Sequence, residues 1–147
     1  MHWILTGWII ALGTGCSGFH GAWRQEATTN PGYPPSMIEG AWEGEWISDS
    51  NGHHGRLRCL LTENEDGTYT TWYHAKYLKF LGFAYAVEVN SNPSDKGYSL
   101  SGQADLGKLA GGMYHYEGTI SDGHFKATYE SKYDDGTFRM TRPLTDP

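Results

Sequence analysis

Positive charge is scarce in this sequence, and its scarcity excludes one large class of partner. Only 11 of the 147 residues are Lys or Arg against 17 Asp or Glu, the formal net charge is −6, and no run of basic residues occurs. Because nucleic-acid binding depends on neutralising phosphates with Lys and Arg, we expect no nucleic-acid partner. The aromatic content of 14%, with 6 Trp and 10 Tyr, argues against a disordered chain.

The sequence also lacks the short motifs that accompany common catalytic and metal sites. No G-x-S-x-G, H-E-x-x-H, P-loop or C-x-x-C pattern occurs. The spacing of the 7 His fixes no set of three or four zinc ligands. We therefore expect surface positions for the strand histidines His74, His115 and His124, and we predict no metal and no cofactor.

Glu43 and Glu45 form a carboxylate pair that could serve a hydrolase, because they share one side of a predicted strand about 7 Å apart. Arg56 and Arg58 alternate in the same way on the next predicted strand. In an antiparallel hairpin these two pairs face each other, so we predict cross-strand ion pairing on a wet surface. Because these carboxylates are expected to pair with arginines rather than to act on a substrate, we predict that the protein is not an enzyme.

The sequence has a single long apolar run, and it lies at the very start. Residues 3–15 carry no charge. Thirteen residues of helix rise about 20 Å, which is too short to cross a bilayer core of about 30 Å. That length is typical of the apolar core of a secretory signal, so residues 1–15 are predicted to be a signal peptide.

Leu12-Gly13-Thr14-Gly15-Cys16 follows this run and resembles the lipobox of bacterial lipoproteins. The resemblance implies that Cys16 is lipidated and becomes the first residue of the mature chain. The protein would then be anchored to a membrane of the cell envelope, on its periplasmic side or at the cell surface. The alternative is a plain secreted protein, in which a Cys16–Cys59 disulfide becomes possible.

Residues 16–39 are rich in Gly, Pro, Ser and Thr and show no apolar period of 2 or 3.6 residues. This composition predicts a flexible linker after the lipidated cysteine. Such a linker would hold the following domain away from the membrane surface.

From Gly40 onward, short segments of alternating polarity are separated by Asn-Gly and Asp-Gly pairs, which favour tight hairpins. The turn pairs are Asn51-Gly52, Asp66-Gly67, Asp122-Gly123 and Asp135-Gly136, and a longer polar loop is expected over residues 90–97. The predicted strands are 41–48, 55–63, 68–77, 82–90, 97–106, 112–121, 124–133 and 136–142.

Eight consecutive strands over residues 40–143 predict an all-β domain. An open sheet of this kind would leave two long edges exposed, and closure into a barrel removes them. We therefore predict a small, eight-stranded, antiparallel up-and-down β-barrel, with a two-sheet sandwich as the alternative.

The alternation turns seven tyrosines toward the inside of this barrel. A buried hydroxyl without a partner costs roughly 1–3 kcal/mol, so such tyrosines need a hydroxyl network, ordered water or a ligand. Small residues of the same parity, Gly44, Gly102 and Gly118, leave space or let the strands coil sharply. The inward tyrosines are Tyr69, Tyr73, Tyr85, Tyr98, Tyr114, Tyr116 and Tyr129.

Gly40-Ala41-Trp42 on the first strand, together with Arg142 on the last, is similar to the pattern of the calycins, which include lipocalins and avidins. The resemblance implies a tryptophan across the base of the barrel with an arginine packed over it. In physical terms this is a guanidinium stacked on an indole face. Trp42 and Arg142 have matching inward parity, and Arg139 is the other candidate for the arginine.

Two functions follow for such a barrel. In the first, an aromatic cavity binds a small apolar or aromatic molecule. In the second, side chains fill the barrel and the protein is a structural or interaction module, with Trp72, Phe80 and Leu81 as its external contact. The candidate ligand-binding residues are Trp46, Tyr69, Tyr73, Phe83, Tyr85, Tyr98, Tyr114, Tyr116, Tyr129 and Phe138.

Overall fold

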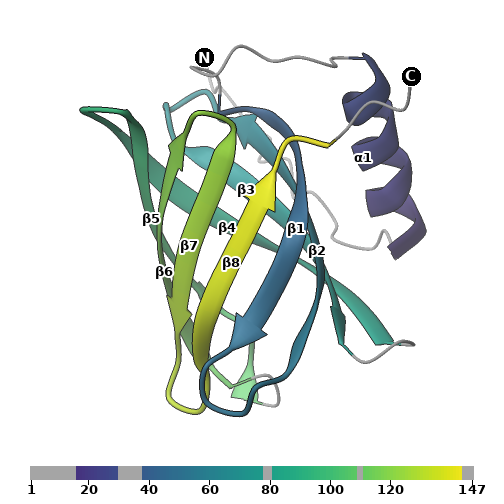
Figure 1. The fold of residues 1–147 in the computed structure, drawn as a ribbon, viewed down its shortest axis with the longest axis vertical. Coiled ribbons are helices and arrows are strands. Elements are labelled where there is room, and N and C mark those ends of the chain that lie inside the picture. The colour runs from purple at the N-terminus through teal and green to yellow at the C-terminus, as the bar shows by residue number, and fades with distance from the viewer. Residues whose placement is uncertain (1–15, 30–37, 78–80, 109–110, 144–147) are drawn as a thin grey trace, which may run out of the picture.

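A computed structural model describes residues 16–29, 38–77, 81–108 and 111–143. It contains one helix and eight strands, which close into a barrel in sequence order, with the helix lying against the outside (Figure 1). The elements are α1 (Cys16–Thr29), β1 (Gly40–Ser48), β2 (His54–Glu63), β3 (Tyr69–Tyr77), β4 (Leu81–Ser94), β5 (Gly97–Asp105), β6 (Met113–Ser121), β7 (His124–Glu130) and β8 (Asp135–Thr141).

Every strand pairs antiparallel with its neighbours in the chain, and β1 closes the barrel against β8. In that closing pair Trp46 lies opposite Phe138, so aromatic residues from the two ends of the sheet meet inside. The β1–β2 register places Glu43 opposite Arg58 and Glu45 opposite Arg56. The predicted fold class, an eight-stranded antiparallel up-and-down barrel, is confirmed.

Turn chemistry explains most of the hairpins. Asp122 and Gly123 both have positive φ, as the tightest hairpin turn requires. Two predicted turns were wrong. Asp135-Gly136 lies within β8, because a bend over residues 131–134 already reverses the chain. The loop expected over residues 90–97 is mostly strand, because β4 continues to Ser94 and pairs with β5.

The predicted flexible linker is wrong over its first half, because Cys16–Thr29 is a helix. Phe19, Trp23 and Ala27 follow one another at four-residue spacing and so share one face of that helix. This face packs on Ala41, Leu60 and Trp72, which are outward residues of β1, β2 and β3. The rest of the linker, residues 30–37, and the signal peptide, residues 1–15, lie outside the described residues.

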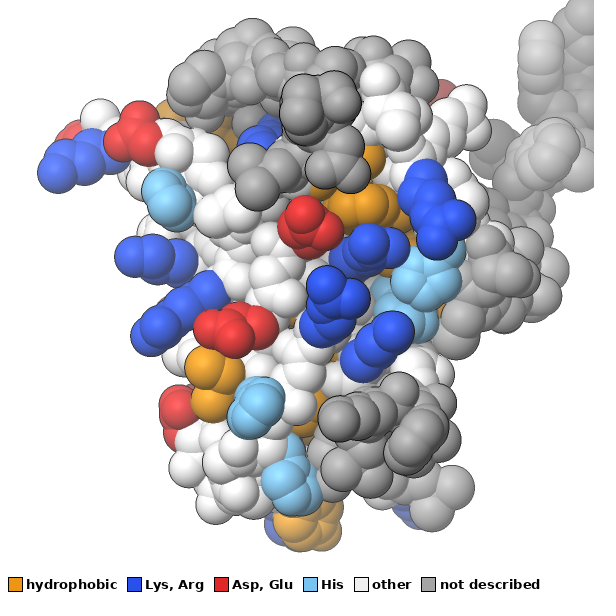
Figure 2. Space-filling view, turned by 45° about the vertical axis from the view of Figure 1, so that its right-hand side comes forward, with side chains coloured by type: hydrophobic (Ala, Val, Ile, Leu, Met, Phe, Trp, Pro, Cys, Tyr) orange, Lys and Arg blue, Asp and Glu red, His pale blue; other side chains and the backbone are white. Residues whose placement is uncertain are grey.

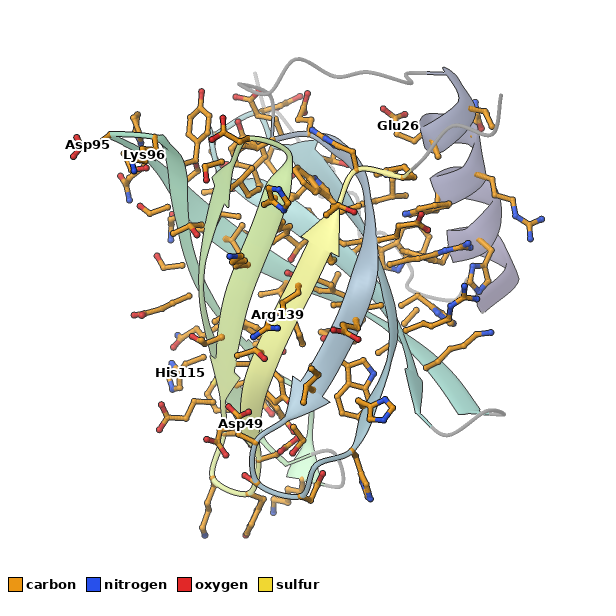
Figure 3. The ribbon with its side chains drawn as sticks, viewed as in Figure 1. Glu26, Asp49, Asp95, Lys96, His115 and Arg139 are labelled. Carbon is orange, nitrogen blue, oxygen red and sulfur yellow. The ribbon has the colours of Figure 1, made fainter. Side chains whose placement is uncertain are left out.

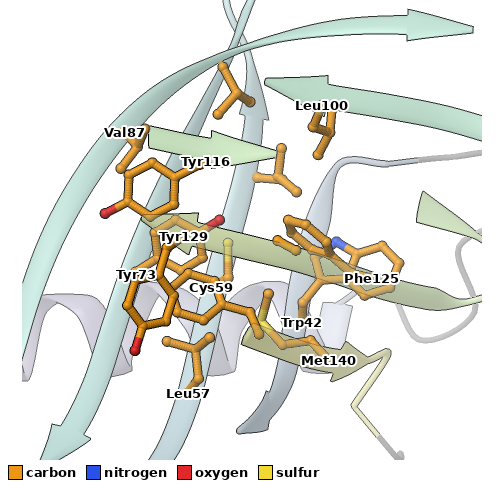
Figure 4. Packing of buried hydrophobic residues seen from close by; sticks show 14 of the residues in the cluster. Trp42, Leu57, Cys59, Tyr73, Val87, Leu100, Tyr116, Phe125, Tyr129 and Met140 are labelled. Carbon is orange, nitrogen blue, oxygen red and sulfur yellow. The ribbon is translucent and has the colours of Figure 1, made fainter. Parts of the chain in front are cut away.

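The interior of the barrel is one continuous apolar cluster, part of which is drawn in Figure 4. Each strand contributes every second residue to it, as the pleat requires. Small glycines allow the sheet to coil tightly: a Cβ on Gly44 would lie only 1.8 Å from the Arg139 carbonyl oxygen. Of the two roles considered for Gly44, leaving space inside the barrel or letting the strands coil sharply, the structure therefore supports the second.

Candidate functional site

One end of the barrel is closed by Trp42. Its side chain is 1% exposed, its ring packs edge-on against Phe125 at 5.7 Å, and its Nε1 donates a hydrogen bond to the Ile38 carbonyl oxygen. The Arg142 guanidinium carbon lies 3.9 Å from the Trp42 ring centroid, which is the stacking that the sequence predicts. Arg142 also donates to the Ala41 carbonyl oxygen at 3.2 Å. We call this end, with Trp42 and Arg142, the closed end.

Burial lowers the pKa of Arg142 to about 10. The guanidinium is therefore charged at neutral pH while lying over an apolar ring. Its contacts with the Trp42 face and the Ala41 carbonyl replace part of the water that it loses. The closed end is thus a packed, hydrogen-bonded plug.

The opposite end, where the β1–β2 and β7–β8 turns lie, contains a cavity of about 270 Å³. We call this the cavity end. Aromatic side chains from β1, β4, β6, β7 and β8 form most of its wall, and turn residues form the rim. The lining residues are Trp46, Asn51, His53, Ala75, Tyr85, Leu106, Tyr114, Tyr116, Tyr129, Asp134 and Phe138.

The aromatic rings of this wall pack on one another and fix its shape. Phe138 lies 5.1 Å from Tyr129, 5.4 Å from Tyr73 and 6.1 Å from Tyr116, measured between ring centroids. Tyr73 stacks on Tyr85 at 5.3 Å. Contacts of this geometry are favourable beyond the area that they bury, so the cavity wall is preformed.

Polar groups at the rim come from one short network. Asp134 accepts hydrogen bonds from the Ser48 hydroxyl at 2.5 Å and from the Tyr129 hydroxyl at 3.2 Å. These bonds tie the β7–β8 turn to the end of β1 and place a carboxylate beside the aromatic wall. Burial, followed by the neighbouring Asp134 charge, raises the pKa of Tyr129.

Three further interior tyrosines, Tyr73, Tyr85 and Tyr116, are also uncharged at neutral pH. Burial raises the pKa of Tyr73 and Tyr85 well above the ordinary phenol value, and it raises the pKa of Tyr116. Within the described residues, no buried side-chain nitrogen or oxygen lacks a hydrogen-bond partner. Among the described residues, the cavity therefore offers ring faces and tyrosine hydroxyls, with Asn51, His53 and the Asp134 carboxylate at its rim.

The structure brings six of the ten predicted ligand-binding residues to the cavity wall: Trp46, Tyr85, Tyr114, Tyr116, Tyr129 and Phe138. Tyr73 lies in the core behind them. Tyr69 and Tyr98 face inward but belong to the closed end, where β3 and β5 begin. The side chain of Phe83 lies outside the described residues.

Sequence reasoning missed the turn residues of the rim: Asn51, His53, Leu106 and Asp134. They follow no strand alternation, so no periodic signal assigns them to the inside. Ala75 has the inward parity of Tyr73, and this alternation could have found it.

Cys59 is free and completely buried inside the barrel, beside Tyr73 in the sheet register of β2 and β3. A disulfide between Cys16 and Cys59, the alternative open at the level of sequence, is therefore wrong. Burial also raises the pKa of the Cys59 thiol well above its ordinary value, so it is a poor nucleophile.

Two outward residues are covered by the helix. His74, predicted at the surface, is only 4% exposed because Phe19 stacks over it at 5.5 Å. Trp72, predicted as an external contact, packs edge-on against Phe19 at 5.0 Å. Phe80 and the side chain of Leu81 lie outside the described residues.

The described part of the chain holds no group of three or more His, Cys, Asp or Glu side chains placed to bind a metal ion. It also contains no helix with the length and apolar character needed to cross a membrane. Comparison with protein-family models, with curated proteins and with solved structures found no match for this chain.

Proposed function

We propose that this chain is a lipid-anchored protein of the cell envelope whose barrel binds a small apolar or aromatic molecule. The observation that carries the binding part is the cavity of about 270 Å³ with an aromatic wall at the cavity end. Ligand pockets commonly measure about 300–1,000 Å³ and are lined by apolar and aromatic groups with a few polar ones. This cavity lies just below that range, which favours a ligand no larger than a single-ring compound.

The mechanism of binding would be burial against the rings, with orientation set at the rim. Trp46 and Phe138 offer flat faces to an apolar or aromatic body, and Trp46 is held in place because its Nε1 donates to the Lys76 carbonyl oxygen at 2.8 Å. The Tyr129 hydroxyl and Asp134 would orient a polar group of the ligand. No covalent step is needed.

The alternative function is a structural or interaction module with a filled barrel. The packed core from Trp42 to Tyr73 fits either function, because it occupies only part of the interior. The cavity is the feature that favours ligand binding. A module of the alternative kind has no use for an aromatic chamber at one end.

The anchor is the second part of the proposal, and the resemblance of residues 12–16 to a lipobox supports it. Cys16 is also the first residue of α1, whose Phe19 face packs on β1–β3. A lipid on Cys16 would therefore hold the barrel close to the membrane, in contrast to the long flexible spacer that the sequence predicts.

The binding proposal is tested by titrating the protein with p-cresol and toluene while observing the ligand signals by NMR. We expect saturable binding that disappears in Ala75→Phe or Ala75→Leu, because either larger side chain projects into the cavity. Thr128→Phe is the matched control, since Thr128 is exposed on the outer face of β7. The proposal is supported if the Ala75 variants are folded and lose binding while the Thr128→Phe control still binds. No binding to the unmodified chain, or equal loss in the control, contradicts it.

A further inference from the structure

A second hollow lies outside the barrel, between α1 and the outer face of β1–β3. Its volume is about 570 Å³, and it is separate from the aromatic cavity. Figure 2 shows Lys, Arg and His side chains gathered on the face that carries α1. We call this hollow the basic cleft, and its charged and imidazole lining residues are His20, Arg24, Glu43, Arg56, Arg58, His74 and Lys76.

The charge of this cleft is opposite to that of the whole chain. Among the described residues that line it, four side chains are cationic, Arg24, Arg56, Arg58 and Lys76, and one is a carboxylate, Glu43. They belong to a protein of net charge −6 with only 11 Lys and Arg. Like charges held together repel one another, so a cluster of this kind is most stable with an anion among its members.

Arg58 at the base of the cleft is held by three contacts. Its guanidinium carbon lies 4.0 Å from the Trp23 ring centroid, its Nε lies 3.9 Å from a Glu43 oxygen, and its Nη1 donates to His20 Nδ1 at 3.4 Å. These contacts come from both the helix and the barrel. Arg58 therefore depends on the docked helix for its position.

The other three cations are differently placed. Arg24, Arg56 and Lys76 are exposed, and no hydrogen bond or ion pair within the described part of the chain engages their side chains. They come from α1, β2 and β3, so the fold brings together cations that are far apart in sequence. Their donors remain available to a ligand.

Two imidazoles complete the cleft. His20 and His74 lie with their ring centroids 4.3 Å apart. Burial is the main cause that lowers the pKa of both rings; Arg58 is the next cause at His20, and His20 followed by Lys76 at His74. A bound anion would reverse the electrostatic part of this effect, and its arrival is therefore measurable at these two rings.

We propose that the basic cleft binds a phosphate-bearing anion, with Arg24, Arg56 and Lys76 as the groups that contact it and Arg58 as a positioning residue. Guanidinium groups hold phosphate oxygens through paired hydrogen bonds, and a lysine adds a point charge. The cleft shares no described lining residue with the aromatic cavity, so this site does not depend on the proposed barrel ligand.

The test is a titration of the full chain with pyrophosphate, followed by calorimetry and by NMR of the His20 and His74 rings. We expect saturable binding, upward pKa shifts at both rings, and at least about tenfold weaker binding in the double variant Arg24→Gln/Arg56→Gln. Lys96→Gln/Lys132→Gln is the control, because it removes the same charge from two exposed turns that do not line the cleft. No binding to the unmodified chain, or equal weakening in the control, overturns the proposal.

The same variants distinguish two sources of the phosphate. Vesicles of phosphatidylglycerol and of phosphatidylcholine are compared with pyrophosphate as competitor. Cleft-dependent binding to the anionic vesicles, blocked by pyrophosphate, identifies a lipid headgroup. Pyrophosphate binding without a cleft-dependent preference for anionic vesicles identifies a soluble phosphate ester. Absence of cleft-dependent pyrophosphate binding overturns the proposal, whatever the vesicles bind.

Discussion

Arg142, just beyond the last strand, lies over Trp42 of the first strand, with its guanidinium carbon 3.9 Å from the ring centroid. The contact joins residues that are 100 positions apart in the chain, and the hydrogen bond to Ala41 adds to it. Because β1 and β8 are the pair that closes the barrel, this contact secures the seam at its closed end.

Removing that guanidinium gives the first prediction. Arg142→Ala should lower the free energy of unfolding by roughly 1–3 kcal/mol, because the indole face loses its cover and the Ala41 carbonyl loses its donor. Chemical denaturation measures the change. Arg139→Ala, which truncates an exposed arginine on β8, should change it by less than about 0.5 kcal/mol (Figure 3). An equal loss in both variants would mean that the stacking over Trp42 adds nothing specific.

The helix gives the second prediction. Phe19 is 0% exposed and packs on Trp72 and His74, so Phe19→Ala should weaken the docking of α1 by about 3–5 kcal/mol while the barrel stays folded. Amide hydrogen exchange should show faster exchange in α1 and unchanged exchange in β5–β7. Gln25→Ala, at an exposed helix position, is the control. Unchanged protection of α1 in the Phe19 variant would rule out this docking face.

The third prediction concerns pH. The pKa of His20 and of His74 is lowered in the folded protein, so the unfolded chain binds protons more readily than the folded one. Stability from these groups is complete above the ordinary histidine pKa of about 6.5 and falls as the pH drops below it toward the folded values.

The denaturant concentration at the midpoint of unfolding should therefore decrease as the pH is lowered from 7.5 to 5.5. In His74→Phe the midpoint should decrease less over the same pH range. His115→Phe should leave the decrease unchanged, because His115 is exposed and points away from the barrel (Figure 3). A slope that is identical in all three proteins would show that His74 has no part in the effect.

The fourth prediction concerns the anchor. Cys16→Ser should move the protein from the membrane fraction to the soluble fraction, because the thiol that would carry the lipid is gone. Cys59→Ala should leave the distribution as it is, since Cys59 is buried in the barrel. Metabolic labelling with a radioactive fatty acid gives a second readout. Membrane association that survives in the Cys16 variant would refute lipidation.

The barrel could be predicted from the sequence because its signal is local. Alternation places Trp42, Cys59 and Tyr73 inside and Glu43 and Arg58 outside, and the structure keeps that parity. Turn pairs such as Asp122-Gly123 set the strand breaks through backbone conformation, which neighbouring residues decide. Closure then follows from the cost of exposed sheet edges.

The helix could not be predicted with the same ease, because its stability comes from distant residues. Phe19 and Trp23 are spaced for one helix face, but glycine, serine and threonine surround them. Their partners, Leu60 and Trp72, meet only when β2 and β3 pair. Trp72 has outward parity, and on an isolated barrel such a large apolar side chain would be exposed to water. This was the sequence feature that indicated a covering element.

The rim of the cavity was unpredictable for a different reason. Asp134 and His53 lie in turns, where no period relates a residue to a face. The hydrogen bond from Ser48 to Asp134 spans 86 positions and depends on barrel closure. The sequence therefore predicts the aromatic wall but not the polar groups that would orient a ligand.

The most direct test of ligand binding is native mass spectrometry of the full chain purified from its own cells under conditions that preserve bound molecules. A ligand-binding barrel should show a discrete excess mass from one small organic molecule, present in the unmodified protein and in Thr128→Phe and absent from Ala75→Phe. A spectrum of the chain with no added mass, together with no uptake of p-cresol or toluene, would show that the barrel binds no ligand of this class.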